Sequence, residues 1–254
     1  MFFQRRSGKK LAGFVGIFFL GAVVMPPEGH AHFRDYVWNE VYRSLPQGGF
    51  EVEGWTTMKV PHHDISNENT FEYQTELEYG VTDHLTIAHY ERFQTVNQAG
   101  DDDVTQYSGF KFETKYRLAE KGKWWVDPLH YLEWATDPRD HDNPNAIEGK
   151  VVLSKDLGKF NMTYNQIMES ALGDGGRTEH EFTAGMNCAV LEDLKLGMEI
   201  KGQYWHPSSN RNELAMGPTV SYETKWFWVS WGTLFGLNHE GDDVQSRIIV
   251  GVPF

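Results

Sequence analysis

The stretch that decides the fold is FEYQTELEY, at residues 71–79. Its odd-numbered positions, from Phe71 to Tyr79, hold aromatic residues, threonine or leucine, and its even-numbered positions hold glutamate or glutamine. Successive side chains of an extended strand point to opposite faces. This period of two therefore predicts a strand with one apolar face and one charged face.

The same alternation recurs along the chain from residue 50 onward. It is plain at residues 108–118, where Phe110, Phe112 and Tyr116 alternate with charged residues, and again at 194–204. Further alternating segments lie near 50–60, 85–96, 124–136, 146–155, 160–171, 178–190, 213–223, 226–237 and 244–254. The pattern predicts an all-β fold of about twelve antiparallel strands.

The connections between these segments are of two kinds, which alternate along the chain. The short ones lie at 82–84, 120–123, 156–159, 192–193 and 224–225. The longer, polar ones lie at 61–69, 97–103, 137–145, 173–177, 206–212 and 238–243. Short turns at one end and longer loops at the other, with an even number of strands of about ten residues each, are typical of a transmembrane β-barrel.

A secreted β-sandwich is the alternative fold for so many alternating strands. A sandwich turns its apolar face to a closed core, so large aromatic residues seldom gather at its strand ends. Here one group lies beside the short turns: Tyr79, Tyr116, Trp124, Phe160, Tyr222 and Phe227. A second group lies near the longer loops: Phe71, Trp134 and Tyr204. Two aromatic girdles are expected at the two interfaces of a membrane barrel, which favours that fold.

The composition of the 254 residues excludes several other classes of protein. The 23 basic and 36 acidic residues give a formal charge of -13, which argues against binding to nucleic acid. A single cysteine, Cys188, rules out a disulfide framework within the chain, and it falls on the apolar face expected to meet lipid. The mean hydropathy of -0.53 excludes a membrane protein built from several helices.

The first residues have the pattern of a secretory signal peptide. Four basic residues lie within residues 1–10, and the 15-residue run 11–25 carries no charge. The small residues Gly29 and Ala31 suit cleavage before His32, so residues 1–31 are expected to be removed. An uncleaved anchor helix is the alternative, but the apolar run is shorter than the roughly 20 residues that span a bilayer.

Residues 32–49 precede the first strand and lack its alternation. Tyr36, Val37, Val41 and Leu45 fall near helical spacing, so this segment is expected to be a periplasmic leader, either loosely ordered or folded as a short plug helix. The barrel itself is expected to occupy residues 50–254.

The end of the chain carries a resemblance to a known class of protein. Val250, Val252 and Phe254 alternate at the C-terminus, which resembles the assembly signal of Gram-negative outer-membrane proteins, although Pro253 departs from the usual pattern. LEYGVTD at 77–83 is similar to a turn that recurs in porin-like outer-membrane barrels.

The resemblance implies the outer membrane of a Gram-negative bacterium, with both termini in the periplasm. The partners it implies are the lipid bilayer, lipopolysaccharide and the machinery that assembles barrels. It implies no assigned activity, and no cofactor is expected; the oligomeric state stays open.

With the apolar face against lipid, the charged face lines the lumen. The residues predicted there are Glu72, Glu76, Glu78, Lys111, Glu113, Lys115, Glu133, Glu148, Lys150, Glu181, Glu199, Lys201 and Arg247. Acids outnumber bases on this face, while the phase of residues 85–94 is left open. The pattern predicts a porin-like barrel that passes small solutes and favours cations. The alternative is a closed barrel, filled by paired charges, that supports the envelope or docks a partner.

The longer loops and one short motif raise two less favoured functions. His62, His63, Asp140 and His141 are candidate metal ligands, which would suit a metal-linked envelope protein, but we favour solvated acidic loops as their explanation. The motif at 206–208, His-Pro-Ser, is the one place where an outer-membrane phospholipase could be sought. Proline breaks strand pairing there, so we expect no enzyme activity.

Overall fold

The computed structural model describes residues 34–62, 68–97, 104–141, 144–173, 176–205 and 212–254. The expected signal peptide, residues 1–31, lies outside this part of the chain. The described residues form the strands β1 (Phe50–Val60), β2 (Asn69–Thr82), β3 (Leu85–Asn97), β4 (Val104–Arg117), β5 (Asp127–Thr136), β6 (Asn145–Leu157), β7 (Phe160–Leu172), β8 (Thr178–Ala189), β9 (Leu194–Trp205), β10 (Asn212–Glu223), β11 (Trp228–Gly236) and β12 (Val244–Pro253).

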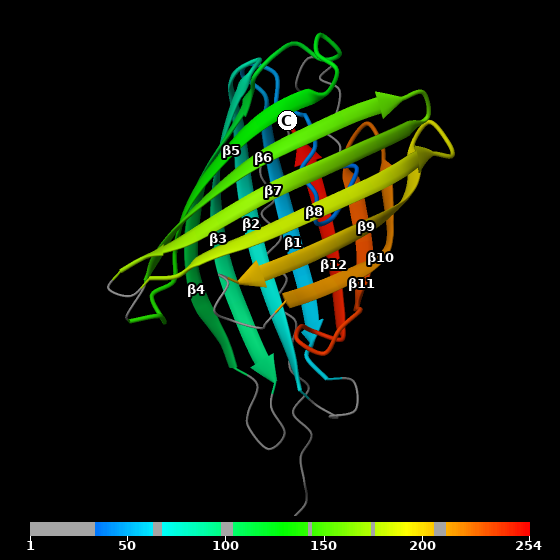
Figure 1. The fold of residues 1–254 in the computed structure, drawn as a ribbon. Helices are drawn as coiled ribbons and strands as arrows, with labels where there is room; N and C mark the ends of the chain where they lie inside the picture. Colours follow the sequence, from blue (N-terminus) through cyan, green and yellow to red (C-terminus); the bar gives the residue numbers. More distant parts are fainter. Residues whose placement is uncertain (1–33, 63–67, 98–103, 142–143, 174–175, 206–211) are drawn as a thin grey trace, which may run out of the picture.

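The strands form one closed antiparallel barrel in which each strand pairs with its neighbours in sequence (Figure 1). β1 and β12 complete the ring, with Val52 opposite Val252 and Thr57 opposite Arg247. We call the end where β1 begins and β12 finishes the turn end, and the opposite end the loop end. A single closed sheet excludes the β-sandwich.

The two faces of the barrel wall differ as the alternation predicts. On β2, the side chains of Leu77 and Tyr79 are exposed on the outside, whereas Glu76 and Glu78 are 0% and 3% exposed on the inside. The expected girdle residues Tyr116, Phe160 and Tyr204 are exposed as well. An outward apolar belt around a polar interior is the arrangement that a bilayer requires of a barrel.

The sequence did not decide which residues of β3 face the lumen, and the structure does. Thr86, Ala88 and Tyr90 are buried on the inner face, so His89 and Glu91 lie on the outer one. Further along, the register between β3 and β4 shifts, because Ser108 is an extra residue on β4.

A glycine makes this β-bulge possible. Gly109 has φ of 96°, and a Cβ atom added there would lie 1.7 Å from the carbonyl oxygen of Thr136. Both the positive φ and the close approach of a neighbouring backbone require a residue without a side chain.

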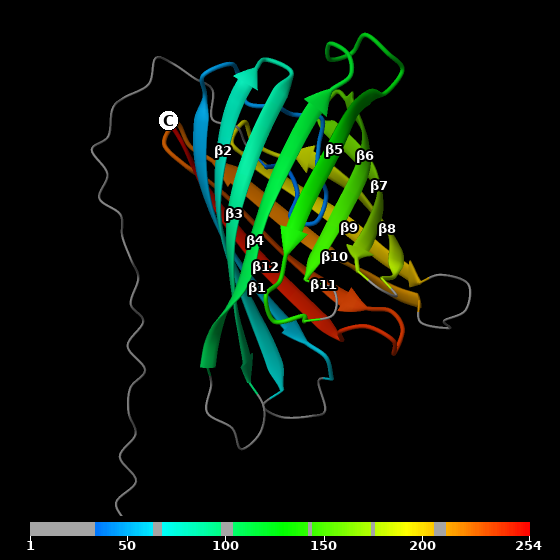
Figure 2. The ribbon, with the colours of Figure 1, turned by 90° about the vertical axis from the view of Figure 1, so that its left-hand side faces the viewer.

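Residues 34–49, which we call the leader, differ from both expectations for this segment. They form no helix, and they are not loosely ordered: Tyr36, Val37 and Leu45 are at most 3% exposed. The leader enters the lumen from the turn end as an irregular chain (Figure 2). The helical spacing of its apolar residues predicted a helix wrongly. Side chains of the barrel wall, and not the leader's own carbonyl groups, accept most of the hydrogen bonds that the leader backbone donates. No helix in the described part of the chain is long and apolar enough to cross a membrane.

The bulge generates a prediction about stability. We expect Gly109→Ala to lower the free energy of unfolding by about 1 to 3 kcal/mol, because the added methyl group meets a backbone carbonyl and the residue keeps a positive φ. Urea unfolding in detergent measures the change. Gly149→Ala is the control, since a Cβ atom there has no neighbour within 4 Å. Equal stability of the two variants would contradict this role of Gly109.

Candidate functional site

The lumen has two parts, and the leader separates them. The turn half contains the leader, packed against inward side chains that have almost no exposed surface, including Leu129, Val152 and Asn165. The loop half contains a cavity of about 340 Å³ whose lining includes Arg34, Val37, Trp38 and Glu40 of the leader. The leader therefore fills the lumen at one level and forms part of the boundary of an open cavity at another.

The carboxylate of Glu199 on β9 holds the middle of the leader. It accepts hydrogen bonds from the backbone N–H groups of Val37, Trp38 and Asn39 at 2.8, 2.8 and 2.9 Å. The side-chain amide of Asn39 donates a further bond of 2.8 Å. Glu199 is 1% exposed, so these four donors replace the water that an ionised carboxylate would otherwise need.

Small polar side chains on the inner wall bind the rest of the leader backbone. Asn165 accepts a hydrogen bond of 2.7 Å from the N–H of Glu40, and Thr163 donates one of 2.8 Å to its carbonyl oxygen. The hydroxyl groups of Thr86 and Ser154 likewise accept hydrogen bonds from backbone N–H groups of the leader, and those of Ser221 and Ser230 donate to its carbonyl oxygens. These side chains supply the backbone partners that a helix or a sheet would otherwise provide.

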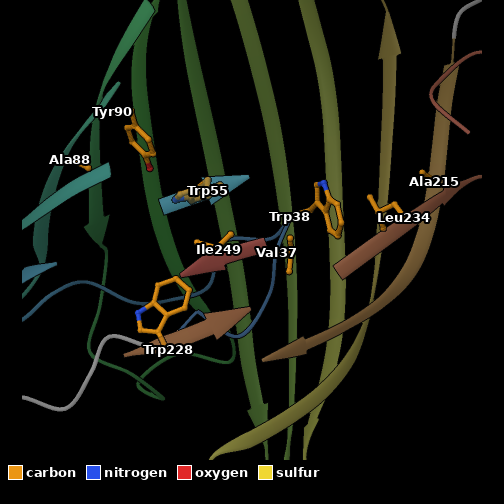
Figure 3. Packing of buried hydrophobic residues seen from close by; sticks show 9 residues of the cluster. All are labelled: Val37, Trp38, Trp55, Ala88, Tyr90, Ala215, Trp228, Leu234 and Ile249. Carbon is orange, nitrogen blue, oxygen red and sulfur yellow. The ribbon is translucent and has the colours of Figure 1, made fainter. Parts of the chain in front are cut away.

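Two glycines of the wall make room for the leader's aromatic side chains. A Cβ atom on Gly185 would lie 2.6 Å from the ring of Tyr36, and one on Gly232 would lie 2.7 Å from the ring of Trp38. Val37 and Trp38 join a buried apolar cluster with the inward residues Trp55, Ala88, Tyr90, Ala215, Trp228, Leu234 and Ile249 (Figure 3). Side-chain packing therefore holds the leader in the lumen together with the hydrogen bonds.

The charges of the leader are also paired. Asp35 lies 2.5 Å from Lys195 of β9 and 2.9 Å from Arg43. Glu40 forms an ion pair with Arg34 and lies 3.8 Å from Lys115 of β4. Buried charges of this kind are tolerated only when they are paired, so their positions specify one seating of the leader.

Eight of the predicted lumen residues line the cavity: Glu72, Lys111, Glu133, Glu148, Lys150, Glu181, Lys201 and Arg247. Six of them form ion pairs within this set, Lys111–Glu133 at 2.9 Å, Lys150–Glu148 at 3.4 Å and Lys201–Glu181 at 3.0 Å. Glu72 pairs with Lys59 at 2.7 Å. The cavity is therefore lined by neutralised pairs rather than by a ring of free carboxylates.

The described lining residues give this cavity a different charge from the one expected. The bases are Arg34, Lys59, Arg92, Lys111, Arg139, Lys150, Lys201 and Arg247, and the acids are Glu40, Glu72, Glu133, Glu148, Glu169 and Glu181. Eight bases against six acids leave a small positive surplus. The surplus of carboxylates on the whole inner face lies elsewhere.

At the loop end, Arg139 of the connection 137–144 reaches the cavity. Its guanidinium donates hydrogen bonds to Gln94 and, at 2.9 Å, to the carboxylate of Asp137. These bonds hold the pKa of Asp137 below its usual range. The loop end of the cavity thus keeps a charged pair at neutral pH.

The other five predicted residues lie in the turn half. Glu76, Glu78, Glu113 and Lys115 are at most 6% exposed, and Glu199 holds the leader as described. The Nζ atom of Lys115 lies 2.6 Å from Glu78 and 3.0 Å from Glu113. In this state these five residues do not line the cavity.

The structure does not bring the predicted loop ligands together. His63 lies outside the described residues, and His62, Asp140 and His141 belong to no described group of three close metal-ligating side chains. The groups of that kind in the described residues consist of glutamates of the turn half. The motif at 206–208 also lies outside the part that the structure describes.

The residues of the expected assembly signal lie on the outer face of the last strand. Val250, Val252 and Phe254 are exposed, and the ring centroid of Phe254 lies 5.9 Å from that of Phe50. The N–H of Phe254 donates a hydrogen bond of 2.7 Å to the carbonyl oxygen of Phe50, at the seam that closes the barrel. Recognition of these residues by the assembly machinery stays a prediction.

Sequence reasoning missed the polar residues that bind the leader. A signal was present: Ser154, Thr163, Asn165, Ser221 and Ser230 occupy inward positions of β6, β7, β10 and β11, where long charged residues stand on β2 and β4. Small polar residues on one side of a lumen leave space for something to fill it.

No protein-family model and no curated protein sequence matches this chain. Solved structures do match it. An outer membrane channel from Pseudomonas putida F1 is similar over 86% of this chain and 100% of its own, with a TM-score of 0.59 and 13% identity. The NanC porin is similar over 81% and 98%, with a TM-score of 0.55 and 12% identity. The translocator domain of the autotransporter NalP from Neisseria meningitidis is similar over 82% of this chain and 89% of its own, with a TM-score of 0.51 and 8% identity. These likenesses show the fold of an outer-membrane β-barrel.

The contacts of Glu199 predict how the leader responds to a mutation. In Glu199→Gln one acceptor oxygen is replaced by an NH₂ group that faces N–H donors, which we expect to weaken the seating of the leader by about 1.5 to 3 kcal/mol. Protease cleavage within residues 34–49 of the folded protein should become faster. Glu181→Gln is the control, because Glu181 pairs with Lys201 in the cavity. Cleavage at the wild-type rate in both variants would refute the role of Glu199.

Proposed function

We propose that this protein is an outer-membrane channel for small hydrophilic solutes, and that its leader closes the pore in the state described. One observation carries the proposal: the turn half of the lumen is filled by a separate segment of chain and not by strand side chains that meet across it. The channel and porin named above support this assignment by their fold. Passage is passive: solutes move down their own concentration gradients along a polar path through the barrel.

Displacement of the leader would leave a partly polar surface behind it. The wall that binds residues 34–45 combines serine, threonine and asparagine side chains, which can be hydrated, with apolar clusters that pack on Val37, Trp38 and Tyr42. Each hydrogen bond to the leader can be exchanged for one to water. The polar part of the wall would then offer solutes a hydrated path.

The preference for cations belongs, in this proposal, to the open state. With the leader in place, the cavity has a small surplus of bases. Without it, Arg34 and Glu40 leave the lumen together, and the carboxylates of Glu53, Glu76, Glu113 and Glu199 come into contact with water. Rings of carboxylates attract cations in channels, so the open pore should favour them.

A closed barrel that docks a partner is the second candidate. The observation that favours it is the number of contacts between the leader and the wall. The leader backbone donates hydrogen bonds to Glu199 and Asn165, and its aromatic rings pack against two glycines of the wall. In that case the leader is a permanent part of the core.

Conductance in planar bilayers distinguishes the two candidates. We expect the wild-type protein to be closed most of the time, and a variant lacking residues 34–45 to conduct steadily, with a reversal potential in a salt gradient that shows cation preference. Glu76→Gln in the same deletion background should reduce that preference, because it removes one lumenal carboxylate. Circular dichroism confirms that each variant is folded. A folded deletion variant without conductance would favour the closed barrel, and a preference for anions would refute the proposed selectivity.

A further inference from the structure

Five glutamates are buried together on the inner faces of β1, β2 and β4, in the turn half of the lumen. They are Glu51, Glu53, Glu76, Glu78 and Glu113, and none is more than 3% exposed. β1 and β2 are neighbours in the barrel, and β3 lies between β2 and β4; the register places Glu51 opposite Glu78 and Glu53 opposite Glu76. The side chains of an inner face converge in this way because the barrel is closed.

Lys115 and Arg34 lie beside this cluster. Lys115 lies 2.6 Å from Glu78 and 3.0 Å from Glu113, and Arg34 lies 3.8 Å from Glu53. Both cations also contact Glu40 of the leader, so their positive charge is shared between the cluster and Glu40.

Hydrogen bonds satisfy only part of the cluster. The indole N–H of Trp55 donates to Glu53 at 2.8 Å, and the hydroxyl group of Tyr90 donates to Glu113 at 2.5 Å. In contrast, neither carboxylate oxygen of Glu51 or of Glu76 has a hydrogen-bond partner among the described residues. A fully buried ionised carboxylate without a partner is strongly unfavourable, so this group needs a counter-charge or a proton.

The spacing of the carboxylates fits a metal ion. One oxygen from each of Glu51, Glu53 and Glu78 lies within 4.8 Å of the other two, and the same holds for Glu76, Glu78 and Glu113. Oxygens about 2.3 to 2.6 Å from one central ion would lie at such separations. Lys115 already supplies a positive charge to Glu78, which both sets share, and to Glu113 of the second set. The first set also contains Glu51, whose carboxylate oxygens have no hydrogen-bond partner among the described residues.

We propose that Glu51, Glu53 and Glu78 bind one hard divalent cation, of which Ca²⁺ is the best fit. Three carboxylates supply oxygen ligands without nitrogen or sulfur, which suits Ca²⁺ and Mg²⁺ rather than zinc or copper. Mg²⁺ keeps several of its waters, whereas this site is enclosed and its ligands are fully buried, so Ca²⁺ is preferred.

The site has a structural consequence that is independent of transport. Glu51 and Glu53 belong to β1, which closes the barrel against β12, and Glu78 belongs to β2. Arg34 of the leader lies next to Glu53. A bound cation would join the first two strands close to the closing seam and beside the entry of the leader. The site would exist in a permanently closed barrel as well as in a gated channel.

Calcium titration of the refolded full-length protein in detergent tests the proposal. We expect isothermal titration calorimetry to show one Ca²⁺ per chain, bound more tightly than Mg²⁺, and thermal unfolding to shift upward in Ca²⁺ because the ion binds the folded state. Tb³⁺ should occupy the same site and emit on tryptophan excitation, since the Trp55 indole donates to Glu53, and Ca²⁺ should abolish that emission.

Variants identify the ligands. Glu51→Gln should weaken Ca²⁺ binding by about tenfold or more, because ligand charge sets the affinity of such sites, and it leaves the ion pairs of Glu53 and Glu78 intact. Glu53→Gln should have a similar effect. Glu169→Gln is the matched control, since Glu169 is a lumenal glutamate that lines the cavity of the loop half.

Three outcomes would overturn the proposal. The first is the absence of Ca²⁺ binding to folded wild-type protein, which would mean that protons neutralise the cluster. The second is unchanged affinity in both Glu51→Gln and Glu53→Gln. The third is an equal loss in Glu169→Gln, which would indicate non-specific attraction to the lumen. None of these results depends on whether the barrel conducts.

Discussion

The hydrogen bonds that converge on the Glu199 carboxylate decide how the inside of this barrel is organised. They fix the middle of the leader at 2.8 to 2.9 Å from one wall residue, deep in the lumen. Once Val37 and Trp38 are placed there, their side chains must pack against inward residues of neighbouring strands, and the leader backbone must find further polar partners. The apolar cluster that includes Trp55, Tyr90 and Trp228 meets the first need, and small polar residues of β6, β7, β10 and β11 meet the second.

The second constraint comes from the membrane. The outer face must be mainly apolar, so most charged groups of the strands are directed into the lumen, where they need partners; Glu91 of β3 is an exception. The charges divide into two sets. Those of the loop half are neutralised in pairs around a cavity, whereas those of the turn half are buried beside the leader, where carboxylates exceed the cations near them. The same surplus of acid thus bears on gating, ion preference and the proposed cation site.

Sequence reasoning predicted the barrel well because its evidence is local. Alternation, turn length and terminal aromatic residues each show within a few residues, and the strand bounds follow to within about four residues. β4 begins at Val104, four residues before the predicted segment 108–118. β5 begins at Asp127 and not at residue 124, after an exposed connection that contains Trp124. The sequence of β3 alone could not show which of its residues face the lumen, because the polar residues His89 and Glu91 lie on its outer face. The neighbouring strands settle the orientation.

The candidate site was predicted only in part, since its contacts join residues far apart in sequence. The thirteen charged positions could be assigned to the inner face, but nothing local separates those of the cavity from those beside the leader. The apolar spacing of the leader suggested a helix, although its partners lie more than a hundred residues away, as with Val37 and Glu199. Metal ligands were sought in polar loops, whereas Glu51 and Glu53 lie on a strand.

Amide hydrogen exchange measures directly whether Glu199 holds the leader in the lumen. Exchange should be measured residue by residue on the folded wild-type protein in a lipid environment. We expect the backbone N–H groups of Val37, Trp38 and Asn39 to exchange as slowly as those of the barrel strands, because all three donate to a buried carboxylate. Exchange of these three amides at the rate of an unfolded chain would contradict it.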